Sequence, residues 1–66
     1  MAKRKYTLIG VDGNAFAIMD YTAKALRETN HKDLVDKMRE EAMSSDYNNL
    51  ICVCDRYVGI ANGDKV

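Results

Sequence analysis

Residues 47–61 read YNNLICVCDRYVGIA and form the most informative segment of the chain. Their apolar residues recur at helical spacing and make one stripe, which consists of Tyr47, Leu50, Ile51, Cys54, Tyr57, Val58 and Ala61. Ser44-Ser45-Asp46 before this segment is expected to end the preceding helix and to cap the next one. Asn62-Gly63 after it is a strong helix-ending signal. The sequence therefore predicts a helix from about Tyr47 to Ala61.

This predicted helix is apolar over a wide arc, because Val53 and Ile60 lie away from the centre of the stripe. A chain of 66 residues buries only about 60% of the surface that its unfolded form exposes. Two interpretations of the arc stay open. Part of it contacts a second copy or another protein, or an N-terminal strand covers it. Self-association would also stabilise so small a domain.

Two further helices are predicted upstream. Asn14 is a good N-cap, so the first helix begins at Ala15, and Thr29-Asn30 ends it. Its inward face would carry Ala15, Ile18, Met19, Thr22, Ala23 and Leu26. Asn30, with Asp33 three residues later, can cap a second helix that runs to about Met43. The apolar stripe of that second helix is Leu34, Val35, Met38 and Ala42.

Residues 6–11 read YTLIGV, a short run rich in β-branched and aromatic residues, and it ends at Asp12-Gly13-Asn14. This pattern predicts a strand followed by a turn. A single strand leaves backbone groups unpaired, so we expect two copies to pair antiparallel across a two-fold axis. The alternatives are an extended arm packed along the helices, or pairing with the edge strand of a partner.

Together these elements predict an α+β fold, one short N-terminal strand followed by three helices in one domain. The boundaries are a flexible basic N-terminus at 1–5, a single β-α-α-α domain at 6–62 and a polar tail at 63–66. The surface predicted to meet a second copy comprises Tyr6, Leu8, Val53, Tyr57 and Ile60.

Composition excludes several functional classes. Ten basic and ten acidic residues give a formal net charge of zero at pH 7, which argues against a cationic nucleic-acid coat, a polyanionic DNA mimic and a disordered charged tail. The apolar runs are far shorter than the roughly 20 residues that span a bilayer. No secretory signal follows the basic start. We therefore expect a cytoplasmic protein that does not contact a membrane.

The sequence predicts neither a cofactor nor a metal site. Cys52 and Cys54 would point away from each other on a helix, and His31 is far along the chain from both. The two thiols fit a reducing compartment, where they act as small buried apolar groups.

No catalytic set is predicted either. Asp12, Asp20, Asp46 and Asp55 lack the spacing of a calcium loop and are expected to be solvated or capping residues. The cysteines fall within an apolar helix, and His31 is expected to be exposed at the start of the second helix. We therefore expect a protein that is not an enzyme.

One turn is a candidate ligand site. Gly10-Val11-Asp12-Gly13-Asn14 connects the predicted strand to a helix, and such turns aim backbone N–H groups at a ligand. The simpler interpretation is turn geometry, with Gly13 at positive φ and Asn14 capping. As a binding site it would comprise Lys3, Arg4, Lys5, Asp12, Gly13 and Asn14. The three basic residues would attract a phosphate backbone only weakly, so nucleic acid is a secondary candidate partner.

Residues 5–16, KYTLIGVDGNAF, together with residues 45–50, SDYNNL, resemble a family of small uncharacterised proteins encoded by bacteriophages and prophages. The likeness implies an accessory phage protein in the host cytoplasm. Proteins of that size and origin are often inhibitors of bacterial defence, such as anti-CRISPR proteins, or sponges for nucleotide signals. The resemblance does not imply a functional role for any particular residue of this chain.

The function has two candidate interpretations. The first is a non-catalytic binding protein, dimeric or higher, that occupies a surface on a host protein and so inhibits a defence system. The alternative is an oligomeric sponge that binds a nucleotide or other phosphorylated small ligand at the strand-to-helix turn.

Overall fold

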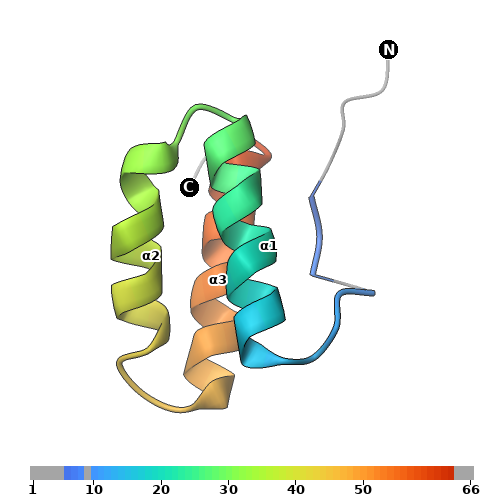
Figure 1. Ribbon diagram of the computed structural model, residues 1–66, viewed down its shortest axis with the longest axis vertical. Helices are drawn as coiled ribbons and strands as arrows, with labels where there is room; N and C mark the ends of the chain where they lie inside the picture. Colours follow the sequence, from blue (N-terminus) through green and yellow to red (C-terminus); the bar gives the residue numbers. More distant parts are fainter. Residues whose placement is uncertain (1–5, 9, 64–66) are drawn as a thin grey trace.

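The fold is an antiparallel bundle of three helices, seen in the computed structural model that describes residues 6–8 and 10–63 (Figure 1). The elements are α1 (Ala15–Glu28), a short 3-10 helix η1 (Lys32–Leu34), α2 (Val35–Ala42) and α3 (Tyr47–Ala61). Helix α3 packs against both α1 and α2. None of the helices in the described ranges is long and apolar enough to cross a membrane.

The predicted N-termini of α1 and α3 are confirmed, and each has a side-chain cap. The Asn14 side-chain oxygen accepts hydrogen bonds from the backbone N–H groups of Phe16, at 2.8 Å, and Ala17, at 3.4 Å. The Asp46 carboxylate accepts from the Asn49 N–H at 3.0 Å. Each cap satisfies donors that a helix start otherwise leaves free, so both helices begin where the sequence predicts.

Asn30 does not cap the second helix, which corrects the prediction. Its φ of 71° makes it the left-handed residue that ends α1. The His31 N–H donates to the Leu26 carbonyl at 2.7 Å, and the Asn30 N–H donates to the Arg27 carbonyl at 3.4 Å. These two hydrogen bonds together form a Schellman motif. His31 is half-buried rather than exposed, with Nδ1 3.0 Å from the Thr29 hydroxyl. The chain then enters α2 through η1, without a side-chain cap.

The core lies between the inward faces of the three helices and largely follows the predicted stripes. Its most deeply buried large side chains are Leu26, Met38, Thr22 and Cys54. Thr22 is polar, and its hydroxyl donates to the Ile18 carbonyl of the preceding turn at 2.9 Å, so its burial leaves no unpaired donor. Cys52, in contrast to Cys54, is exposed.

The predicted α+β class is wrong, because the described part of the chain contains no strand and the fold is all-α. At Tyr6, the backbone N–H donates to the Asn62 side-chain oxygen at 2.6 Å, and the carbonyl accepts from the Asn62 amide nitrogen at 2.9 Å. We call this pair of bonds the amide clamp. A side-chain amide thus supplies the donor and acceptor that a neighbouring strand would supply, and the case for strand pairing across a dimer falls.

Side chains of α1 also hold this N-terminal segment. The Thr7 N–H donates to the Tyr21 hydroxyl at 2.9 Å, and the Tyr6 hydroxyl donates to Glu28 at 2.8 Å. The rings of Tyr6 and Tyr21 meet edge to face, with centroids 6.2 Å apart. Tyr6, Leu8 and Val11 all pack against the core. The segment is therefore an arm packed on the helices, and Figure 1 shows its course beside α1.

The wide apolar arc of α3 is largely buried within the chain itself. Val53 and Tyr57 are 3% and 5% exposed, inside the chain's own core. The other residues predicted to meet a second copy, Tyr6, Leu8 and Ile60, are half-buried and packed against that core. The arc is thus covered within the chain, where α3 packs against α1 and α2, and the N-terminal arm packs against the same core.

Candidate functional site

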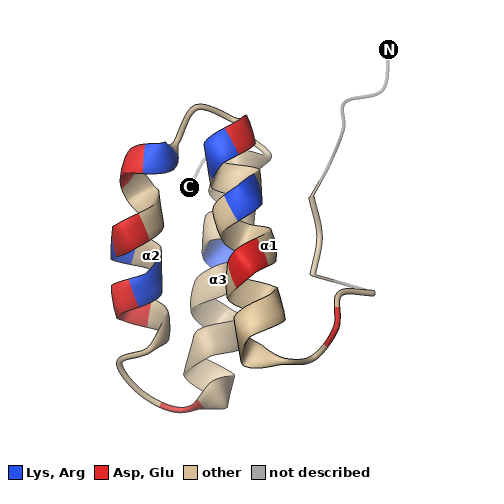
Figure 2. Cartoon of the chain, viewed as in Figure 1, with Lys and Arg blue, Asp and Glu red and all other residues tan. Residues whose placement is uncertain are grey.

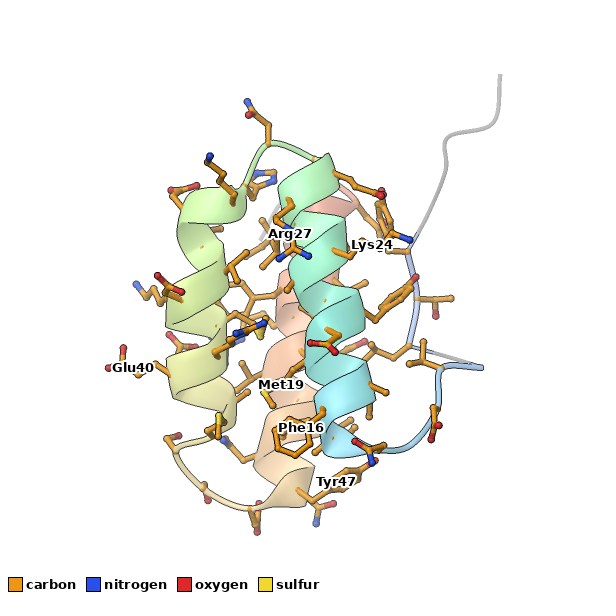
Figure 3. All side chains as sticks on the ribbon, in the orientation of Figure 1. Phe16, Met19, Lys24, Arg27, Glu40 and Tyr47 are labelled. Carbon is orange, nitrogen blue, oxygen red and sulfur yellow. The ribbon has the colours of Figure 1, made fainter. Side chains whose placement is uncertain are left out.

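An open apolar groove lies at one end of the bundle, where α1 and α3 begin and α2 ends. It has a volume of about 280 Å³ and is lined by Ala15, Phe16, Met19, Ala42, Met43, Ser45, Asp46, Tyr47 and Leu50. Figure 3 shows Phe16, Met19 and Tyr47 together at this end, with Lys24 and Arg27 towards the other end of α1. We call this surface the end groove.

The end groove has a buried floor and exposed walls. Met19 and Leu50, on the floor, are each 5% exposed and belong to the core. Phe16, Met43 and Tyr47 are large apolar side chains that are 67%, 63% and 47% exposed. Single exposed apolar residues are ordinary on a protein surface, whereas several gathered around one hollow mark a binding surface.

Local hydrogen bonds fix the walls in place. The Asn14 cap sets the start of α1 and so holds Phe16 in its first turn. Tyr47 is the first residue of α3, and its hydroxyl donates to the Gly13 carbonyl at 2.5 Å. Met43 ends α2, and its N–H donates to the Arg39 carbonyl at 3.0 Å. The groove is therefore formed before any partner arrives, which lowers the entropy cost of binding.

The loop between α2 and α3, which forms the remaining wall, is held in the same way. The Ser44 hydroxyl donates to the Glu41 carbonyl at 2.7 Å, and the Asn49 amide donates to the same carbonyl at 3.0 Å. These two bonds satisfy an acceptor at the end of α2 and connect the loop to the first turn of α3.

The groove has an acidic rim. Among the described residues that line it, Asp46 is the only carboxylate, and none is Lys or Arg. Asp12 is exposed in the turn that the Tyr47 hydroxyl contacts through Gly13. Figure 2 shows acidic residues on both loops at this end, beside uncharged first turns of α1 and α3. A partner at this surface therefore meets apolar side chains beside negative charge.

The predicted ligand turn is built differently from the expectation. Positive φ occurs at Gly10, at 87°, and not at Gly13. Asp12 accepts from the Asn14 N–H at 3.2 Å, and two N–H groups at the start of α1 already donate to the Asn14 side chain. Asp12, Gly13 and Asn14 thus have structural partners, and this geometry does not favour a phosphate site. Lys3, Arg4 and Lys5, predicted to complete that site, lie outside the described residues.

The groups with shifted pKa values lie elsewhere. Burial raises the pKa of the Cys54 thiol, against a smaller opposing effect of Thr22. Burial first, and the Glu41 carboxylate second, raise the pKa of Tyr57. Neither side chain lines the end groove. Within the described ranges, no three His, Cys, Asp or Glu side chains come together in a way that could hold a metal ion.

Sequence reasoning missed the end groove. Phe16 and Met43 fall outside the predicted apolar stripes, and the helical pattern assigns Tyr47 to the apolar stripe of α3 although it is 47% exposed. The available signal was the presence of large apolar residues at positions where the helical pattern predicts solvent. A comparison with protein-family models, with curated proteins and with solved structures gave no match. The geometry of the end groove is therefore the strongest indication of function in this molecule.

Proposed function

We propose that this protein is a non-catalytic binding protein that takes apolar side chains of a protein partner into the end groove. The observation that carries the proposal is the position of Phe16, Met43 and Tyr47, exposed around a floor of buried core residues. Burying such side chains in a preformed hollow is the usual source of binding energy at protein interfaces.

The biological setting that we propose is inhibition of a bacterial defence system by occupation of a host protein, in the manner of anti-CRISPR proteins. The support for it is the resemblance of residues 5–16 and 45–50 to phage and prophage proteins. That setting also supplies the location, the host cytoplasm.

A homodimer remains part of the proposal, with a different surface. Since Val53 and Tyr57 are buried within the chain and Phe16, Met43 and Tyr47 are its exposed large apolar residues among those described, we assign the contact with a second copy to the end groove. Dimer and host complex would then compete for Phe16 and Met43, so the host partner would bind the monomer.

The proposed function is tested by phage plating on strains that carry single defence systems and express this protein. The groove variant is Phe16→Ala with Met43→Ala, two exposed positions where truncation spares the core. The matched control is Arg27→Ala, which is exposed on the same face of α1, about 16 Å along the helix.

We expect the wild type and Arg27→Ala to restore plating on one such strain, and the groove variant to fail. A photo-crosslinking residue at position 16, but not at position 27, should then couple to a component of that same system. A groove variant that restores plating as well as the wild type contradicts the role of the groove. Failure of the wild type on every strain contradicts the defence setting.

A further inference from the structure

The shape and charge of the end groove restrict the kind of segment that it can hold. The proposed function requires only a protein partner with apolar side chains. Volume, backbone hydrogen bonding and rim charge each add a separate restriction.

The volume limits the number of anchoring side chains. An engineered apolar cavity of about 150 Å³ holds one benzene molecule, and the end groove, at about 280 Å³, is nearly twice as large. It therefore accommodates two side chains of the size of Leu or Phe. Met19 and Met43 in its lining are flexible and adapt to the shapes of such side chains.

The backbone around the groove has little to offer an extended peptide. A strand-like ligand gains its affinity from main-chain hydrogen bonds to an open sheet edge, and the described residues contain no strand. The N–H groups of Phe16, Ala17 and Asn49 are already bonded to the capping side chains. A ligand whose own backbone is internally hydrogen-bonded fits this surface better, and a helix is such a ligand.

A helix also presents its anchors at a suitable spacing. Side chains three or four residues apart lie on one face, about 5–6 Å from each other. Two large apolar residues at that spacing can enter the hollow between Phe16, Met43 and Tyr47 side by side. This is the arrangement by which amphipathic helices bind apolar grooves.

The rim restricts the charge of the partner. Asp46 lines the groove, Asp12 lies in the neighbouring turn, and no basic side chain among the described lining residues balances them. Lys or Arg beside the anchors would be attracted to this rim, and acidic residues there would be repelled. Such charges act chiefly on the choice of partner and on the association rate.

We propose that the occupant of the end groove is an amphipathic helix of another protein, with two large apolar residues one turn apart and Lys or Arg beside them. This proposal rests on the proposed function and names the class of its partner.

The test uses three synthetic peptides of about 16 residues, a length at which Ala-rich sequences begin to form helices in water. The first carries two Leu one turn apart in an Ala-rich helix flanked by Lys. The second replaces the Lys residues by Glu. The third is the first peptide with one central residue replaced by Pro, which prevents the helix. Each is titrated into the ¹⁵N-labelled protein, and amide shifts are followed by NMR.

We expect the Lys peptide to shift the amides of residues 15–19 and 42–50 in a saturable manner. The Glu peptide should bind about 3- to 5-fold more weakly at low salt, the effect of one exposed ion pair, and the difference should shrink as salt is added. The Pro peptide should bind at least about 10-fold more weakly than the Lys peptide, since ordering its backbone costs conformational entropy.

Variants identify the surface. Phe16→Ala and Met43→Ala should each weaken the Lys peptide by about 5-fold or more, as truncation of a central contact does. Asp46→Asn keeps a good N-cap and removes one charge, so it should reduce the preference for Lys over Glu. Arg27→Ala should leave binding unchanged.

Several results would overturn the helix proposal. A Pro peptide that binds the groove as tightly as the Lys peptide would assign it to extended segments, and equal binding of the Glu peptide would remove the charge argument. Groove amides that shift with protein concentration but do not respond to the Lys peptide would assign the groove to a second copy alone. These three results leave the phage-plating test intact. Absence of any groove response, combined with a fully active groove variant in plating, would overturn the proposed function itself.

Discussion

Replacing Asn62 by Ala would remove both hydrogen bonds of the amide clamp. These bonds join the Asn62 side chain to the Tyr6 backbone at 2.6 and 2.9 Å, between residues 56 positions apart in sequence. A hydrogen bond in a folded protein contributes about 0.5–1.5 kcal/mol net. Tyr6 is half-buried, so water can partly replace the lost partners, and we expect a total loss of about 1–2 kcal/mol.

The loss is measurable by urea unfolding followed by far-UV circular dichroism. With a slope of about 1 kcal/mol per molar urea for so small a protein, the midpoint should fall by about 1–2 M. Hydrogen exchange at the Tyr6 amide should accelerate as well, because its acceptor is gone. The matched control is Asn48→Ala, at an exposed Asn in the first turn of α3. The reasoning is refuted if both variants have the same midpoint and the Tyr6 amide keeps its protection.

Three further experiments test the core packing, the pH dependence of stability and the backbone conformation of Asn30. Met38→Ala, at a fully buried position, should cost about 2–5 kcal/mol, and calorimetry should show a large fall in melting temperature. Because burial raises the pKa values of Cys54 and Tyr57 in the folded protein, stability should fall as the pH rises above about 8.5, the ordinary value for a thiol. A urea midpoint that stays the same from neutral pH to pH values above about 8.5 would contradict this expected loss of stability. Asn30→Ala should cost about 1 kcal/mol, because Asn30 has a φ of 71° and Ala resists left-handed backbone, whereas Asn30→Gly should be tolerated; equal stabilities of the two variants would argue against that conformation.

The helix positions could be predicted because their signals are local. Asn14 and Asp46 each bond to an N–H within three residues, and Asn62-Gly63 ends α3 through bonds to its own last turn. A short window of sequence contains both partners of every such bond. Asn30 shows the limit of local signals, since Asn is favoured both before a helix and in the left-handed position after one.

The N-terminal arm could not be predicted from its own residues. YTLIGV has the composition of a strand, and the strand prediction failed because the partner of the Tyr6 backbone is a side chain at position 62. No local pattern reveals a contact at that separation. The end groove was missed for a similar reason, because the exposure of Phe16 and Met43 depends on where three separate chain segments meet.

The amide clamp also has a consequence for biosynthesis. A ribosome makes Tyr6 long before Asn62, which follows 56 positions later, so the arm cannot acquire these two bonds until Asn62 has been made. Helix α3, which packs against both α1 and α2, is made just before Asn62, so the inward faces of α1 and α2 stay exposed over the same interval. Chaperones that bind apolar segments would have their best opportunity during that interval.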